Sequence, residues 1–353
     1  MASIRMADTA ARHRRVAAGV EARVLEVLRS GRYVDGPVVE EAQQRLAMVF
    51  GWNHGVGVNS GTDALTYALM AMGVRAGDEV IVPAVTFFAS AGAVVRLGAI
   101  PVIADVRDDL PLLDPKDLPI GPKTRAVMAV HLYGEACRLG PLPVPVVDDS
   151  AQCAGATPPI REGVMAGVSF YPTKTLGAAG DGGMVFCDRP EEAEALRKLT
   201  HHGMPQPYLH EKVGPHVGAN SRLDAMQAAV LLGHLEDLPA RVQSRRQVAS
   251  TYDAELPRWV RRLPRWEGHP VHQYVVRVPQ REWLRQFLQA EGIETAIYYP
   301  RSLSTQPALA EFPRVPTPQA EAFCEESLAL PVHECLSMED LERILQCFRR
   351  FSP

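Results

Sequence analysis

Between residues 55 and 147, short apolar runs alternate with helical segments, and this alternation limits the folds available to the chain. Short strands that are separated by helices form mainly parallel sheets with both faces covered. Ligands of such sheets bind beyond the carboxyl ends of the strands. The pattern therefore predicts an α/β fold with strands at 55–58, 79–82, 101–104, 126–131 and 144–147 and helices at 62–71 and 88–97.

Further helices and strands are predicted on either side of this region. Residues 10–30 have apolar side chains at helical spacing, Gly31 follows as a terminating glycine, and a second helical pattern comes after the next turn. From about residue 257 the composition shifts toward Pro, Arg and Trp. We therefore predict a large domain over 1–240 and a smaller α+β domain over 241–353. Their other elements are a strand at 183–187, helices at 221–235 and 242–256, a strand at 273–278 and a helix at 338–351.

The composition excludes several classes of partner. Hydrophobic residues make up 46% and charged residues 22% of the chain, which is typical of a globular protein and not of a disordered one. A net charge of −4 gives no basic surface for nucleic acid or for a membrane, and no apolar run approaches the roughly 20 residues that cross a bilayer. The six cysteines are scattered without a CxxC pair, so we expect reduced thiols, no metal site and a cytoplasmic protein.

Lysine is rare, and one lysine stands apart from the rest. The chain has five, and Lys174 alone lies in a glycine-rich loop, residues 169–183. Glycines let a backbone approach a ligand closely, and neighbouring hydroxyls can hold phosphate oxygens. Lys174 could attract phosphate by its charge, form an imine with an aldehyde cofactor, or be a solvated lysine on a turn. The spacing does not fit the GxxxxGK[ST] nucleotide-binding loop, because the glycines follow the lysine.

Two acids, Asp148 and Asp149, follow the predicted strand at 144–147. A carboxylate at the end of a buried strand loses solvation unless a positive group faces it, and a pyridinium nitrogen is such a group. Gln152, three residues on, could reach the 3-oxygen of the same ring if a helical turn follows. A metal-binding acid or a plain helix cap explains the acidic pair about equally well.

Two other segments suggest contacts to a planar phosphorylated ligand. In residues 58–65 a strand enters a helix through small polar residues, so free amides at the helix start could bind an anion. An ordinary N-cap by Ser60 or Thr62 is the simpler explanation of that segment. Phe87 follows a predicted strand end, where its face could stack on a ring, although a lone Phe is more often part of the core.

Taken together, these motifs resemble those of the DegT-type (StrS-like) nucleotide-sugar aminotransferases, which are fold type I pyridoxal-phosphate enzymes. The resemblance extends from residues 30–37 to residues 328–331. It implies pyridoxal 5'-phosphate as cofactor, with Lys174 as the Schiff-base lysine, Asp149 at the pyridine nitrogen, Gln152 near the 3-oxygen and Phe87 on the ring. It also implies that the phosphate is held by Gly61, Thr62, Asp63 and Ser169.

The resemblance further implies a homodimer with shared sites. The family places an asparagine of the neighbouring subunit on the phosphate, and Asn220 matches that position. Residues 169–174 and 220–224 are similar to those of members that aminate 3-keto sugars carried on UDP, notably the 2-acetamido-3-oxo-glucuronate type. The expected substrate contacts are Tyr33, Arg222 and Tyr299.

Two departures from the family pattern are visible. The usual His-Tyr-Pro of the small domain is Tyr298-Tyr299-Pro300 here, which touches the expected substrate pocket. Residues 134–144 are too few for the helix that normally precedes the acidic strand. We expect this second change to remove a helix from the outer layer of the fold without harming catalysis.

The reaction implied by the resemblance is a ping-pong exchange that makes amino sugars for polysaccharides or natural products. An amino acid, expected to be glutamate, leaves its amine on the cofactor, and a nucleotide-linked ketosugar then takes it, with the freed Lys174 as general base. A related sugar dehydratase is one alternative, but those enzymes carry histidine in place of the lysine. A non-catalytic regulator with the same fold is another.

Overall fold

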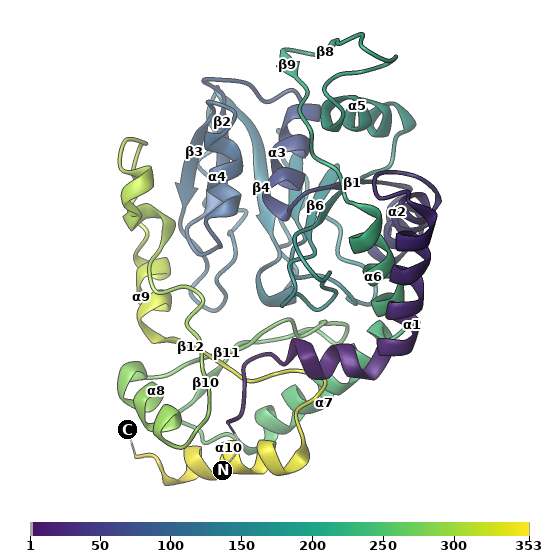
Figure 1. Cartoon of the computed structure of the whole chain (residues 1–353). Helices are drawn as coiled ribbons and strands as arrows, with labels where there is room; N and C mark the ends of the chain where they lie inside the picture. The colour runs from purple at the N-terminus through teal and green to yellow at the C-terminus, as the bar shows by residue number, and fades with distance from the viewer. Residues whose placement is uncertain (1–2, 353) are drawn as a thin grey trace.

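The computed structural model describes residues 3–352, and its larger lobe is built on one seven-stranded sheet (Figure 1). The strand order is β1-β7-β6-β5-β4-β2-β3. The strands are β1 His54–Val58, β2 Glu79–Pro83, β3 Ile100–Ala104, β4 Thr124–Val130, β5 Val146–Asp149, β6 Met165–Ser169 and β7 Gly183–Cys187.

The prediction of a mainly parallel sheet is confirmed. Strand β2 pairs in parallel with β3 and β4, β4 with β5, and β5 with β6, whereas β7 is antiparallel to both β1 and β6. Because β4, β5 and β6 are parallel neighbours, their carboxyl ends lie along one edge of the sheet. Strand β6 was not among the predicted strands, although its last residue, Ser169, was among the expected site residues.

Helices cover both faces of this sheet. On one face lies α3 (Gly61–Ala71), whose Leu65 packs against Gly167 of β6, and α4 (Ala89–Val95) and α5 (Pro190–Thr200) pack with it. On the other face α2 (Pro37–Phe50) and α6 (Ala225–Leu235) form a second core with Ala166 and Val168. Alternate residues of β6 therefore point into two different cores, which is why a strand in this position reads as apolar throughout.

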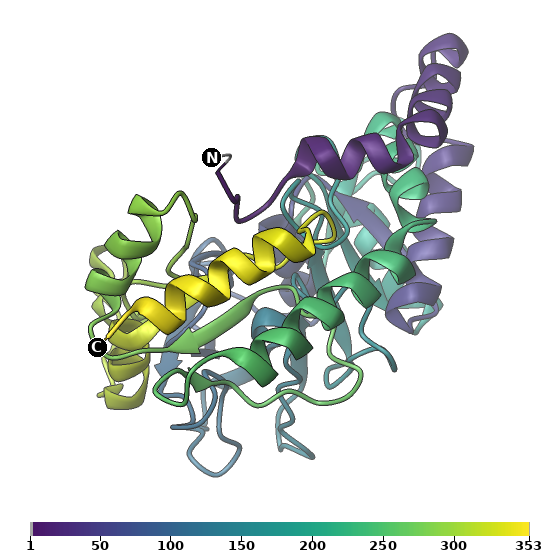
Figure 2. The ribbon, with the colours of Figure 1, turned by 90° about the horizontal axis from the view of Figure 1, so that it is seen from below.

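The smaller lobe is built on a three-stranded antiparallel sheet, β10-β11-β12, and most of its elements come from the C-terminal third of the chain. Two helices of this lobe, α7 and α10, lie side by side (Figure 2). The bounds are α7 Leu238–Glu255, β10 Arg261–Arg262, β11 Tyr274–Arg277, α8 Arg281–Ala290, α9 Pro318–Glu326, β12 Ser327–Leu330 and α10 Met338–Arg350.

Two segments connect the lobes. In its first half, α7 packs Leu238 and Val242 into the core that α2 and α6 share. In its second half, it packs Tyr252 into the core of the small lobe. The expected boundary at 240/241 therefore lies within one continuous helix, and the two-domain division stays a prediction. At the other end of the chain, Ile4 pairs with Ile293 of the small lobe, and α1 (Thr9–Ser30) then runs along α6.

Several element limits differ from the sequence prediction, and capping explains one of them. The helix predicted at 221–235 begins at Ala225, because the Asp224 side chain accepts a hydrogen bond from the Gln227 amide at 2.9 Å and fixes the helix start there. Residues 221–224 are therefore not helical. The absence of a helix between residues 135 and 145, expected from the short segment before the acidic strand, is confirmed.

Candidate functional site

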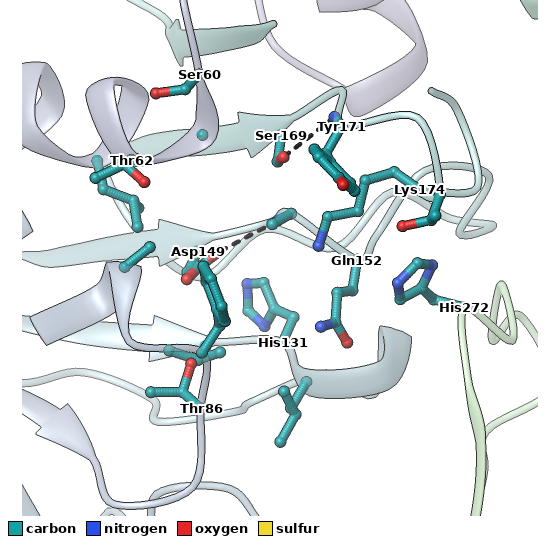
Figure 3. A pocket seen from close by; sticks show the side chains of 18 of the residues that line it. Ser60, Thr62, Thr86, His131, Asp149, Gln152, Ser169, Tyr171, Lys174 and His272 are labelled. Carbon is teal, nitrogen blue, oxygen red and sulfur yellow. Dashed lines mark hydrogen bonds between the residues drawn. The ribbon is translucent and has the colours of Figure 1, made fainter. Parts of the chain in front are cut away.

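A cavity of about 550 Å³ opens at the carboxyl edge of the sheet (Figure 3). Its lining includes the last residues of β4, β5 and β6, namely Val130, Asp149 and Ser169, and the first turn of α3. The small lobe closes it with His272, Gln273, Tyr298 and Tyr299. This is the position in which parallel α/β sheets bind their ligands.

The cavity brings together most, but not all, of the expected site residues. Those that line it are Gly61, Thr62, Phe87, Asp149, Gln152, Ser169, Lys174 and Tyr299. The four that do not line it are Tyr33, Asp63, Asn220 and Arg222.

Lys174 extends its side chain into the cavity from the loop after β6 (Figure 3). A backbone hydrogen bond of 2.8 Å from its amide to the Tyr171 carbonyl closes the turn that holds it. Burial lowers the pKa of the Lys174 amine below its ordinary value, and the Asp149 carboxylate, the largest opposing influence, raises it. An amine with a lowered pKa is neutral in a larger fraction of molecules, so it is a better nucleophile and base.

Asp149 is a buried carboxylate held by defined donors. Its Oδ2 accepts a hydrogen bond of 2.8 Å from the Ser90 hydroxyl, and its Oδ1 accepts one of 3.2 Å from the Ala151 amide. Ser90 has a single hydroxyl proton, so Thr86, 2.9 Å away, donates to Ser90 in turn. Burial raises the pKa of Asp149, and the Ser90 hydrogen bond, the Ala151 amide and Lys174 oppose that rise.

The start of α3 and the end of β6 form a cradle of small groups. A Cβ placed on Gly61 would come within 2.6 Å of the Ser169 Cβ, so no other residue fits there without a shift. Ser60 caps the helix by accepting a 3.1 Å hydrogen bond from the Asp63 amide. The amides of the first helical turn and the hydroxyls of Thr62 and Ser169 border the cavity together, which suits an anion such as a phosphate.

Asp63 uses its side chain for a different purpose. Its two carboxylate oxygens accept hydrogen bonds from Ser221 at 2.6 Å and from Arg96 at 2.7 Å, and its amide is occupied by Ser60. The structure therefore places Asp63 as the tie between α3 and the segment that carries Asn220 and Arg222.

Phe87 is not a core residue. Its side chain is 59% exposed and borders the cavity, and its ring centroid lies 6.1 Å from that of Tyr299. Because so large an apolar surface is left open at a cavity wall, the structure favours a stacking role over the core interpretation.

Gln152 has one end of its amide fixed. The Gln152 carbonyl oxygen accepts a hydrogen bond from the Tyr133 backbone amide, and its NH₂ group faces the cavity wall, where the side chain also hydrogen-bonds Tyr299. The arrangement suits contact with an oxygen of a bound ligand.

Sequence reasoning missed two histidines that line the cavity, His131 and His272. His131 is fully buried; its Nδ1 accepts the Cys137 amide at 3.1 Å, and its Nε2 lies 3.4 Å from Asp148. His272 pairs through Nδ1 with the Thr175 hydroxyl at 3.0 Å. His131 ends a predicted strand, which is a signal that could have identified it, whereas no local pattern distinguishes His272.

Asn220 and Arg222 lie together on the surface outside the cavity. The Arg222 Nε donates to the Asn220 side-chain oxygen at 3.1 Å, and the Arg222 guanidinium lies 3.5 Å from Asp35. Tyr33, which is 50% exposed, lies on the neighbouring segment, where its carbonyl accepts the Ala225 amide. Within one chain these residues form a separate surface group.

The cavity fits pyridoxal phosphate by the chemistry of its groups. A buried carboxylate requires a positive partner, a pyridinium nitrogen can provide one, and an amine that is partly neutral can bind an aldehyde carbon. The first turn of α3 and Ser169, which border the cavity side by side, suit the phosphate of the cofactor. Among residues 3–352 no group of three or more His, Cys, Asp or Glu could hold a metal ion, and none of the described helices combines the length and hydropathy needed to span a membrane.

The whole fold matches that of a solved structure. DesV of S. venezuelae, solved in complex with a ketimine intermediate, superposes with a TM-score of 0.92 and 37% sequence identity, over 99% of this chain and 98% of that one. The fold and the cavity together define a pyridoxal-phosphate-dependent aminotransferase.

The family follows from the sequence match. The model of the DegT/DnrJ/EryC1/StrS aminotransferase family matches residues 16–349, so the chain belongs to this family. The resemblance inferred from the motifs is thereby confirmed.

Two curated relatives illustrate what the family contains. A "pleiotropic regulatory protein" of Geobacillus stearothermophilus is 37% identical, with 93% of this chain and 94% of the relative covered. The UDP-2-acetamido-2-deoxy-3-oxo-D-glucuronate aminotransferase of Pseudomonas aeruginosa is 36% identical, with 92% and 94% covered.

The lowered pKa of Lys174 can be measured directly. Because the chain has only five lysines, ¹³C-dimethylation of the apoprotein gives a simple NMR spectrum, and Lys174→Ala identifies the Lys174 signal by its loss. We expect this signal to titrate below its ordinary pKa of 10.5 in the folded protein and to return toward that value in urea. A folded-state titration at or above the value in urea would contradict the burial argument.

Proposed function

We propose that this aminotransferase moves an amino group from an amino acid, glutamate in the first instance, to the keto group of a nucleotide-linked sugar. The observation that carries the proposal is the placement of Lys174 and Asp149 in one cavity at the carboxyl edge of the sheet. The similarity to a UDP-ketosugar aminotransferase over 92% of the chain supports the sugar class.

Each lining residue takes a role that its surroundings support. The α3 amides with Thr62 and Ser169 bind the cofactor phosphate, Asp149 pairs with the pyridine nitrogen, and Phe87 stacks on the ring. Gln152, whose carbonyl oxygen is held by the Tyr133 amide, donates to the 3-oxygen with its NH₂ group. When bound, pyridoxal phosphate supplies an electron sink for the charge left when a proton departs from the carbon next to nitrogen.

Lys174 moves that proton. Its amine must be neutral to accept a proton, and burial favours the neutral form by lowering its pKa. Asp149 remains the acceptor that holds a positive ring nitrogen, because Ser90 and the Ala151 amide stabilise its charged form. Burial therefore favours the neutral base at Lys174, while the local donors favour the charged carboxylate at Asp149.

We further propose that the working unit is a homodimer in which Asn220 of one copy completes the phosphate site of the other. Support comes from the position of Asn220, which is exposed, and of Arg222, which is half-buried; both lie outside the cavity of their own chain. The substrate contacts are then Arg222, Tyr33 and Tyr299. Of these, Tyr299 lines the cavity of its own chain. The six free thiols support a cytoplasmic location.

The direct test is conversion of the bound cofactor and its return by a sugar. We expect glutamate to shift the absorbance of the wild-type protein from the pyridoxal to the pyridoxamine form, and one of a panel of UDP- and dTDP-linked ketosugars to shift it back. Lys174→Ala should abolish both steps and the visible absorption band of the lysine-bound cofactor. The matched control, Lys198→Ala, removes only a surface pair with Glu194 and should leave all three unchanged.

The same assay separates the alternatives. Conversion by glutamate with no ketosugar reversing it would contradict the sugar class, and a cyclitol or other small ketone would replace it. No change with any amino donor would favour the regulatory alternative. Water elimination from a sugar, with no amine transferred, would favour the dehydratase.

The shared site predicts complementation between two inactive variants. Lys174→Ala removes the amine of a site, and Asn220→Ala removes the group lent to the partner. In a mixed dimer one site carries both defects and the other carries neither, so an equal mixture, unfolded and refolded together, should regain about a quarter of wild-type activity.

Two outcomes would overturn the shared-site arrangement. If both residues served the same site, every site of a mixed dimer would keep one defect, and no activity would return. If Asn220→Ala alone kept full activity, Asn220 would have no part in the site. The unmixed variants, refolded in the same way, are the controls.

A further inference from the structure

Behind the cavity, on the side of Lys174 away from the ligand space, lies a buried group of charged residues that the proposed reaction does not use. Three arginines, Arg12 of α1 and Arg241 and Arg245 of α7, surround one carboxylate, Glu334 of the small lobe. All four side chains are almost completely buried. Among the described residues Asp237 is the other acid of the group, 3.5 Å from Arg241.

Arg12 contacts the backbone of the lysine loop directly. Its Nη1 donates to the carbonyl of Pro172 at 3.0 Å and to the carbonyl of Lys174 itself at 2.9 Å. Its Nε donates to Glu334 at 2.5 Å. One planar guanidinium therefore joins the backbone on both sides of Thr173 to an acid that is 160 residues further along the chain than Lys174.

The next carbonyls of the loop are held in the same way. Arg241 donates to the Thr175 carbonyl at 2.8 Å, and the His234 ring, through Nδ1, lies 2.8 Å from the Gly177 carbonyl. Arg245 binds Glu334 at 3.2 Å and donates to the His272 carbonyl, also at 3.2 Å. The loop backbone is thus fixed at four carbonyls by side chains from α1, α6 and α7.

We propose that Arg12 and Glu334 are positioning residues for Lys174. The inference rests on the proposed role of Lys174, whose amine must reach a ligand atom and later move a proton while its backbone stays in place. The guanidinium of Arg12 fixes that backbone from behind, and Glu334 fixes the guanidinium. Because Glu334 belongs to the small lobe, the same contacts set the lysine loop relative to the His272 and Tyr299 wall of the cavity.

The test replaces the guanidinium of Arg12 by a group of the same charge and a different shape. Lysine in Arg12→Lys keeps a cation beside Glu334, but its single nitrogen cannot bind the carboxylate and two carbonyls in the fork geometry of arginine. The matched control is Arg23→Lys, the same change further along α1 in a partly exposed pair with Glu41. Two readouts need no turnover: the rate at which apoprotein captures pyridoxal phosphate on Lys174, followed by absorbance, and hydrogen exchange of the peptide covering residues 171–178.

We expect Arg12→Lys to capture the cofactor about tenfold more slowly than wild type, with faster exchange in residues 171–178 and an unchanged far-UV spectrum. Arg23→Lys should match the wild type in both readouts. Equal capture rates and equal exchange in the two variants would overturn the proposal, because charge alone would then be enough.

A second variant and a measurement on the wild-type protein test the proposal if Arg12→Lys does not fold. Glu334→Gln keeps the size of the side chain and removes the charge that holds Arg12, so the same two changes are expected. If neither variant folds, the test is hydrogen exchange in the wild-type apoprotein. The proposal requires the amides of Lys174 and Ala178 to exchange as slowly as those of α6. Exchange as fast as in an exposed loop overturns it.

The capture assay also separates this proposal from the proposed function. It contains no amino donor and no sugar, so a wild-type protein that captures the cofactor but aminates no ketosugar leaves the positioning role intact. A wild-type protein that captures no cofactor on Lys174 contradicts the proposed role of Lys174 itself.

Discussion

The site depends on one pair of buried opposite charges, the Lys174 amine and the Asp149 carboxylate. Burial pushes both toward their neutral forms, since it lowers the pKa of Lys174 and raises that of Asp149. Their mutual attraction and the Ser90 hydrogen bond oppose this. In the proposed reaction Lys174 acts in its neutral form and Asp149 in its charged form, and the surrounding structure keeps both groups in place.

That surrounding structure comes from distant parts of the chain. The sheet supplies Asp149 and Ser169 at adjacent strand ends, α3 supplies an anion cradle, and the small lobe supplies His272 and Tyr299. Burial of charge is costly unless each charge is paired and hydrogen-bonded. The arginines behind the lysine loop are stabilised by hydrogen bonds to backbone carbonyls and by the carboxylates of Glu334 and Asp237.

The sequence allowed the sheet and the centre of the site to be predicted, because both are encoded locally. Alternating apolar strands and helices determine the parallel sheet, and the glycine-rich loop distinguishes Lys174 from the other lysines. Contacts between distant segments could not be predicted in this way. Arg12 and Glu334 are 322 residues apart, and neither lies in a motif. The exposure of Phe87 likewise depends on where the small lobe ends, so its sequence neighbours could not exclude the core interpretation.

Asn220 and Arg222 show a different limit of reasoning about one chain. Their positions match a family motif for the active site, yet the fold places them on the surface, where Asp63 and Asn59 hold the segment through Ser221 and Arg222. The first turn of α3, which forms the anion cradle, also carries Asp63. Asp63 therefore joins the turn that borders the cavity to the segment that carries Asn220 and Arg222.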